Sequence, residues 1–183
     1  MGLDHITQKY HSGHKALDIV SYENWERDRG YGEPECAPED VEILAYTGEG
    51  YTPGNTDNLE HGYGIFMKGL ETGYSYLYWH TWPYFPVNVG DIVKRGKIVA
   101  FMGNAGTVRV GGKYVPLNKR TQAPNLGTHL HMEMYTKTWK LGKKKTFVDP
   151  LKHIDFSLEP IYNQFDLLKA FSIILSKVIR NTQ

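Results

Sequence analysis

A strand with two chemically different faces is encoded by the stretch Gly127-Thr-His-Leu-His-Met-Glu-Met134. Side chains alternate along a strand, so His129 and His131 would share one face, with Cα atoms about 6.5–7 Å apart. Leu130 and Met132 would then point to the opposite side, where we expect the hydrophobic core. The stretch therefore predicts a core strand that presents a pair of imidazoles.

A second polar pair occurs in His14-Lys-Ala-Leu-Asp18. An even spacing puts both side chains on one face of an extended chain, and this spacing also aligns them on a helix. Two histidines and one aspartate with an open fourth position are the ligand set of a catalytic zinc site. Structural zinc is usually enclosed by thiolates, whereas this chain has one cysteine, Cys36. The two pairs together therefore predict a catalytic metal site.

Spacing leaves several assignments open. His11 and His14 form a competing ligand pair, and spacing does not decide which of His129 and His131 would bind the metal. The His129–His131 pair or the His14–Asp18 pair, taken alone, also fits an ordinary structural role.

Short runs of β-type residues, separated by turn residues, fill the chain up to Pro150. No helical period of useful length occurs in this part. We therefore predict an all-β, antiparallel domain over residues 1–150. Its strands are expected in Lys15–Ser21, Val41–Thr47, Gly64–Lys68, Tyr74–His80, Ile92–Met102, Thr107–Val110, Lys113–Val115 and Thr128–Thr136.

The pattern changes in the C-terminal tail, residues 151–183. Apolar residues recur at three- and four-residue intervals in Ile161–Arg180, as one face of a helix requires. We expect this helix to pack on the β domain or on a twin helix, and to be the place of any self-association or virion contact.

Composition excludes several classes of protein. The chain has 183 residues and a net charge of +1, so no electrostatically driven nucleic-acid binding is expected. No apolar stretch approaches the roughly 18 residues of a membrane-spanning helix. Asp4 and Lys9 stand where a signal peptide has its apolar core, so we expect no signal peptide.

Taken in order, these motifs resemble the lysostaphin-type (LytM-like) zinc endopeptidases that cut bacterial peptidoglycan. The resemblance spans roughly Ile6 to Pro150. It is carried by Gly13-His-Lys-Ala-Leu-Asp-Ile19, Tyr31-Gly-Glu-Pro-Glu-Cys-Ala-Pro38, Gly62-Tyr-Gly64, Tyr76-Leu-Tyr-Trp-His80, the run from Val87 to Gly106, Gly127-Thr-His-Leu-His-Met-Glu133 and Val148-Asp-Pro150.

The resemblance implies one zinc ion per chain, held by His14, Asp18 and His131, with His129 and His80 as the catalytic pair. A zinc-activated water would attack a peptide carbonyl. His129 would orient or deprotonate the water, and His80 would support the developing oxyanion or the leaving amine. The implied fold is an antiparallel β-sheet or sandwich, of the duplicated hybrid motif kind, with zinc on the floor of a narrow groove. Residues that match no functional position are Cys36, His5, His11, His61 and His153.

The chain departs from the family pattern at two places. Ala16 stands where the family usually has glycine, which is tolerable where the backbone φ is negative. Thr107–Leu126 intervene where the family usually has a short link, and Gly111-Gly112 within them predicts a tight hairpin turn. We expect this insertion to border the groove and to alter substrate choice. Its basic residues are expected to meet carboxylates of the peptide stems; they are Arg109, Lys113, Lys119 and Arg120.

These features predict a zinc endopeptidase that hydrolyses peptide cross-links of peptidoglycan and acts on the bacterial cell wall. All the functional positions of the family are filled. This favours activity over the alternative, a catalytically silent structural or regulatory module of the same fold that retains zinc. Without a signal peptide, the expected settings are a phage lysin, a virion-associated enzyme or a trimmed secreted protein.

Overall fold

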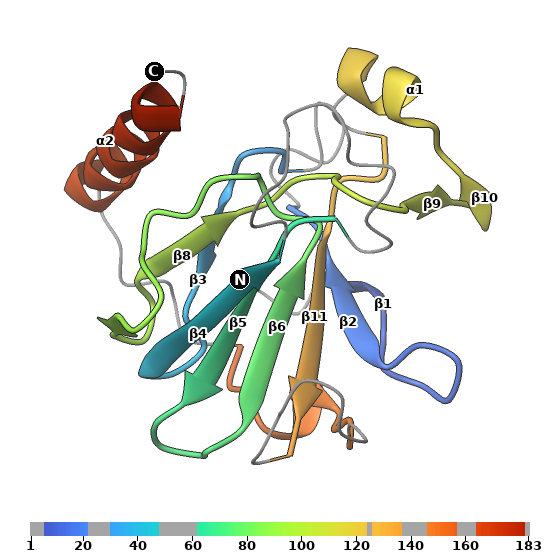
Figure 1. Cartoon of the computed structure of the whole chain (residues 1–183). Coiled ribbons are helices and arrows are strands. Elements are labelled where there is room, and N and C mark those ends of the chain that lie inside the picture. The colour runs from blue at the N-terminus through green and yellow to red at the C-terminus, as the bar shows by residue number, and fades with distance from the viewer. Residues whose placement is uncertain are drawn as a thin grey trace.

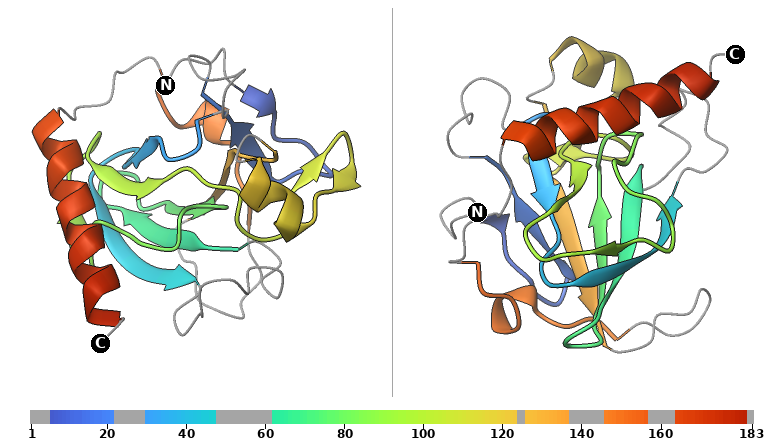
Figure 2. Two further views of the ribbon diagram at one scale, coloured as in Figure 1. Left: turned by 90° about the horizontal axis from the view of Figure 1, so that it is seen from above. Right: turned by 90° about the vertical axis from the view of Figure 1, so that its left-hand side faces the viewer.

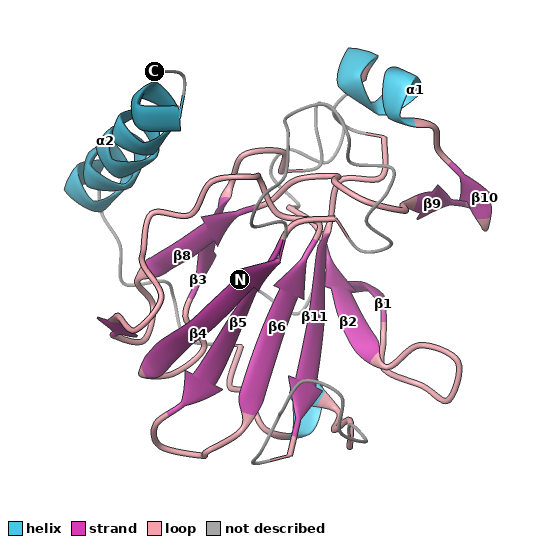
Figure 3. Ribbon diagram, viewed as in Figure 1, coloured by secondary structure: helices cyan, strands magenta, loops and turns pink. Residues whose placement is uncertain are grey.

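The computed structural model describes residues 6–21, 30–47, 62–123, 126–136, 146–156 and 164–181. Its main element is a seven-stranded sheet of order β1-β2-β11-β6-β5-β4-β7, in which neighbouring strands are antiparallel (Figures 1 and 3). This confirms the predicted all-β, antiparallel fold. The strands are β1 (Ile6–Gln8), β2 (Ala16–Ile19), β4 (Val41–Thr47), β5 (Gly64–Gly69), β6 (Ser75–Trp79), β7 (Ile92–Val93) and β11 (Leu130–Tyr135).

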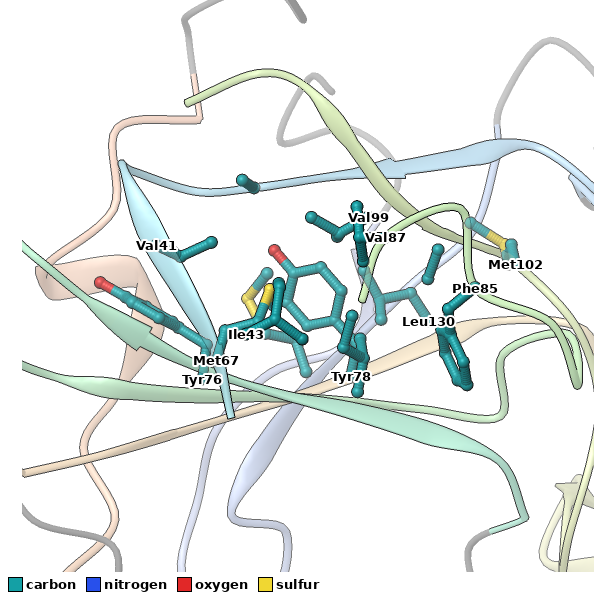
Figure 4. Close-up of a cluster of buried hydrophobic side chains, with 14 of the residues drawn as sticks. Val41, Ile43, Met67, Tyr76, Tyr78, Phe85, Val87, Val99, Met102 and Leu130 are labelled. Atoms are coloured by element: carbon teal, nitrogen blue, oxygen red, sulfur yellow. The ribbon is translucent and has the colours of Figure 1, made fainter. Parts of the chain in front are cut away.

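A second, smaller layer covers one face of this sheet. It is the antiparallel pair of β3 (Pro34–Cys36) and β8 (Ile98–Phe101). The main core fills the space between the two layers, where Val99 of β8 belongs to the same buried cluster as Met67 of β5 and Leu130 of β11 (Figure 4). Leu130 and Met132 are both almost fully buried, as the alternation in their strand predicts. The core therefore holds β11 in the orientation that directs its histidines away from it.

Helix α2 (Gln164–Asn181) lies on the outer side of β8 (Figure 2). Its Ala170 and Ile174 are buried in one cluster with Ile98 and Phe101 of the strand. Lys97 and Asp166 add an ion pair of 3.0 Å between the two elements. Among the described side chains of the helix, four large apolar residues are exposed: Phe165, Leu168, Phe171 and Leu175. No helix in the described part of the chain has the length and apolar character needed to cross a membrane.

The predicted hairpin in the insertion is present. β9 (Arg109–Val110) pairs with β10 (Lys113–Tyr114), and Gly111 and Gly112 form the turn with φ of +56° and +78°. Both glycines adopt the left-handed conformation that a tight two-residue turn of this class requires. The hairpin lies beyond the end of the sheet at which β6 ends and β11 begins (Figure 1).

Three features differ from the sequence-based prediction. The run Ile92–Met102 is divided into β7 and β8 by a turn in which Lys97 N–H donates to the Lys94 carbonyl. β1 and β3 were not predicted, because strands of three residues carry too little local pattern and depend on their partners. The expected loop after the hairpin contains a short helix, α1 (Leu117–Gln122), and a 3-10 turn occupies Pro150–Lys152.

Candidate functional site

Three potential metal ligands converge where β2 and β11 lie side by side. The antiparallel register places Asp18 directly opposite His131. The Oδ1 atom of Asp18 lies 2.9 Å from Nδ1 of His131 and 3.2 Å from Nε2 of His14. His14 stands just before β2, so its ring reaches the same point from the loop that enters that strand.

The donor atoms of these residues fit a zinc-type metal ion. The potential ligand atoms of His14, Asp18 and His131 all lie within 4.8 Å of one another. In a tetrahedral site with bonds of about 2.0–2.1 Å, neighbouring ligand atoms are about 3.3 Å apart. The two separations from Asp18, 2.9 and 3.2 Å, are close to that spacing. Nδ1 of His14 lies 3.3 Å from the Lys9 carbonyl, which only accepts, so in the neutral ring Nε2 carries the lone pair.

The electrostatics of the site favour a bound cation. Burial acts to raise the pKa of Asp18, but the hydrogen bond from His131 and the neighbouring imidazoles outweigh it, so the pKa lies below its ordinary value. Burial also acts to lower the pKa of His131, yet the carboxylates of Asp18 and Glu133 raise it to about 9. An ionised carboxylate among imidazoles therefore attracts positive charge, either protons or a metal ion.

A second pair of histidines adjoins these ligands. The ring centroids of His80 and His129 are 4.6 Å apart. Nδ1 of His80 donates to the Ala105 carbonyl at 2.6 Å, and Nδ1 of His129 donates to the Gly127 carbonyl at 2.7 Å. Carbonyl oxygens only accept, so in each neutral ring the lone pair is on Nε2. Nε2 of His129 lies 3.8 Å from Asp18 Oδ1, which places it at the same centre.

His80 has an unusual backbone conformation. Among the residues that the structure describes, it is the only one other than glycine with a positive φ, +63°. Such a conformation is unfavourable for a side chain with a Cβ and persists where surrounding contacts enforce it. His80 is 4% exposed and follows directly on β6, so the strained turn directs its ring toward His129.

One cavity contains all five residues singled out from the sequence. It has a volume of about 460 Å³ and is open to solvent. Residues of the insertion and of β1 line it as well, among them Val108, Arg109 and Gln8. The ligand atoms of His80, His129 and His131 also lie within 4.8 Å of one another, so His131 belongs to two overlapping groups of potential metal ligands.

The two other described histidines do not line this cavity. His11 is exposed and accepts a hydrogen bond from Gly13 N–H at 3.1 Å, and its ring centroid lies 5.7 Å from that of His14. His153 is exposed and its ring lies against Tyr74. His5 and His61 lie outside the described residues. Cys36 is half-buried in β3, and burial raises the pKa of its thiol to about 12.

Two details of the site concern the departures from the family pattern. Ala16 is fully buried in β2 and does not have a positive φ, so its methyl group is accommodated by extended backbone.

The expectation that Arg120 meets substrate carboxylates is wrong. Arg120 is 1% exposed, and its guanidinium donates to the carbonyls of Val115 and Asn104. Of the insertion's basic residues, Arg109 lines the cavity, whereas Lys113 and Lys119 are exposed and do not line it.

Sequence reasoning missed one neighbour of the site, Glu133. Its Oε1 lies 3.7 Å from Nε2 of His131. The signal was present in the alternation of β11, because positions 129, 131 and 133 share a face of the strand.

Solved structures provide the comparison with known proteins. LytU is 21% identical, with a TM-score of 0.53 over 80% of this chain and 81% of that one. The antimicrobial peptidase lysostaphin from Staphylococcus simulans is 19% identical, with a TM-score of 0.52 over 81% of this chain and 47% of that one. Csd3 from Helicobacter pylori is 14% identical, with a TM-score of 0.50 over 93% of this chain and 36% of that one.

This chain thus spans about half the length of lysostaphin and about a third of the length of Csd3. No protein-family model matches it, and no curated protein sequence matches it either. At these identities the likeness establishes the fold and not the activity. The chain has the lysostaphin/LytM-type fold.

Proposed function

We propose that this protein is a zinc-dependent endopeptidase that hydrolyses peptide cross-links of bacterial peptidoglycan. The observation that carries the proposal is the single carboxylate oxygen of Asp18, which faces His14, His131 and His129 in a cavity that also contains His80. The likeness of fold to lysostaphin, a peptidase, supports this choice of reaction.

His14, Asp18 and His131 would hold one zinc ion. Two neutral imidazoles and one carboxylate would neutralise only one of the two charges of Zn²⁺. When bound, zinc supplies Lewis-acid chemistry, which acidifies water and polarises a peptide carbonyl. The overlapping group of three histidines lacks a carboxylate, and Asp18 makes the two short contacts, so we assign the metal to the group that contains Asp18.

His129 and His80 would move the protons of the reaction. With Nδ1 hydrogen-bonded to the Gly127 carbonyl, His129 can take up the proton of the attacking water at Nε2. His80 can donate from Nε2 to the oxyanion or the leaving amine only in its protonated form. The Ala105 carbonyl continues to accept from Nδ1 in that form, so the ring keeps its orientation.

The substrate would carry a carboxylate near the scissile bond. Of the described residues that line the cavity, Arg109 is the only lysine or arginine. A guanidinium in this position is suited to a carboxylate of the peptide stem, because the two groups form charge-assisted hydrogen bonds. Of the four basic residues of the insertion, we therefore assign substrate choice to Arg109 alone.

The test combines the zinc content of the purified protein with the release of new amino termini from Gram-positive and Gram-negative peptidoglycan. Wild type, His129→Ala and His153→Ala are compared, since His153 is an exposed histidine that does not line the cavity. We expect about one zinc per chain in all three proteins, with amine release abolished only in His129→Ala. Zinc without release from any wall would support the silent module, and absence of zinc would overturn the ligand assignment.

A further inference from the structure

The insertion contains a buried cation that the proposed reaction does not use. Arg120 lies on α1 and is 1% exposed, although arginine is seldom buried unless its donors are paired. Its Nε donates to the Val115 carbonyl at 2.9 Å, and its Nη1 donates to the Asn104 carbonyl. Arg120 therefore connects Val115, which directly follows β10, to the segment that follows β8.

Backbone carbonyls of that segment also accept hydrogen bonds from both proposed catalytic histidines. The Gly103 carbonyl accepts from the backbone N–H of His129 at 3.3 Å, and the Ala105 carbonyl accepts from Nδ1 of His80 at 2.6 Å. Asn104 lies between these two residues. Three consecutive carbonyl groups are thus bonded in turn to His129, Arg120 and His80.

The insertion supports His129 by a second route. Val115 N–H donates to the Val108 carbonyl at 3.0 Å, and Val108 is 1% exposed. Gly127 approaches Val108 so closely that a Cβ on the glycine would lie 2.7 Å from Val108 Cγ2. The carbonyl of Gly127 is the acceptor for Nδ1 of His129. The hairpin therefore packs against the backbone that orients this ring.

We propose that Arg120 is a positioning residue for His80. Its guanidinium fixes the Asn104 carbonyl, and thereby the neighbouring Ala105 carbonyl that orients the imidazole in its strained turn. The insertion then positions a catalytic side chain and also lines the cavity. This inference rests on the proposed function where it concerns catalysis, but the orientation of His80 can be measured without any reaction.

The experiment compares three variants of the full, zinc-loaded chain with wild type. Arg120→Met removes the donors at similar length, Arg120→Lys keeps one cationic donor, and Lys119→Met is the matched control on the exposed neighbour in the same helix. Two quantities are measured. The first is kcat and KM for amine release from peptidoglycan. The second is the proton NMR signal of the His80 Nδ1–H, assigned by its loss in His80→Gln.

In Arg120→Met we expect kcat to fall by about tenfold to a hundredfold, with KM and zinc content unchanged. The His80 Nδ1–H signal should move and exchange faster with solvent. Arg120→Lys should recover part of kcat and of the signal, and Lys119→Met should match wild type.

An unchanged His80 signal with unchanged kcat in Arg120→Met would overturn the proposal. If that variant does not fold, wild-type values of both quantities in Arg120→Lys would overturn it instead, because one ammonium group cannot reproduce both hydrogen bonds of the guanidinium. If wild type releases no amine, the proposed function fails. The NMR signal then decides on the role of Arg120 by itself.

Discussion

Two buried carboxyl groups of this chain have pKa values that are shifted in opposite directions, because only one of them lies among imidazoles. Asp18 is surrounded by imidazoles, which keep its pKa below the ordinary value despite burial. Glu35 on β3 is fully buried, and neither of its oxygens has a hydrogen-bond partner among the described residues. Burial raises the pKa of Glu35 well above its ordinary value. The charge of Asp18 is thus suited to hold a cation, whereas the folded chain retains the proton of Glu35 to a higher pH than the unfolded chain does.

The raised pKa of Glu35 predicts a loss of stability as pH increases. The unfolded chain releases this proton near pH 4.5, whereas the folded chain retains it to a higher pH. Between the two pKa values the folded state binds about one more proton, so the free energy of unfolding decreases with increasing pH. Glu35→Met removes this contribution. Its stability relative to wild type should therefore rise as the pH increases above about 4.5.

Urea denaturation of wild type and Glu35→Met at several pH values measures this difference. Glu71→Met is the control, because Glu71 is exposed. A difference between wild type and Glu35→Met that stays constant over the range would show that the Glu35 pKa is not raised.

The β9–β10 hairpin carries Arg109 into the lining of the cavity, and from this we predict a substrate preference. Arg109→Ser should raise KM for peptidoglycan with free stem carboxylates by about tenfold, while kcat stays within about twofold. The reason is that a charge-assisted contact to the substrate is lost without any change at the metal. On peptidoglycan whose stem carboxylates are amidated, wild type and variant should be equal.

Lys113→Ser is the matched control for this prediction, because Lys113 is in the same hairpin but does not line the cavity. Steady-state amine release from the two substrates measures all the constants. Equal KM values for wild type and Arg109→Ser on the free-carboxylate wall would refute the assignment to Arg109.

On helix α2 we expect substitutions at two neighbouring positions to change the free energy of unfolding by different amounts. Ile174 is 8% exposed against β8, whereas Leu175 is 60% exposed. Ile174→Ala should lower the free energy of unfolding by about 2–3 kcal/mol, and Leu175→Ala should change it by less than about 0.5 kcal/mol. Both variants should retain zinc. Urea denaturation measures the difference, and equal effects at the two positions would mean that the helix does not pack as described.

At the scale of the whole molecule, the proposed metal joins parts of the chain that are far apart in sequence. His14 precedes β2 and Asp18 lies in it, whereas His131 lies in β11. Metal that binds the folded state alone should stabilise it by about 3–4 kcal/mol when free zinc exceeds Kd by about a hundredfold to a thousandfold. Chelation should therefore lower Tm by about 10 °C and abolish amine release, and added zinc should restore both.

Asp18→Asn is the control for chelation. It removes the carboxylate that faces the imidazoles, so its Tm should be the same with and without the chelator. A wild-type Tm that does not respond to chelation would argue against a metal bound by these residues.

Local pattern was sufficient to predict much of the fold. Val41–Thr47 was predicted with the bounds that the structure has, and the Gly111-Gly112 turn was placed correctly. These elements are determined by alternation and by turn chemistry within a few residues. The short strand Pro34–Cys36 was missed, because its pairing with β8 forms with residues about sixty positions away.

The sequence by itself predicts the kind of site, because the His14–Asp18 pair and the His129–His131 pair have spacings that suit a metal. It also determined which face of β11 is apolar. The tertiary structure alone decided that His11 does not line the cavity, that His80 adopts a positive φ and that Arg120 is buried against the Asn104 carbonyl. The physical reason is that spacing reports which side chains share a face of one element. Convergence, burial and strain depend on contacts between elements distant in the chain.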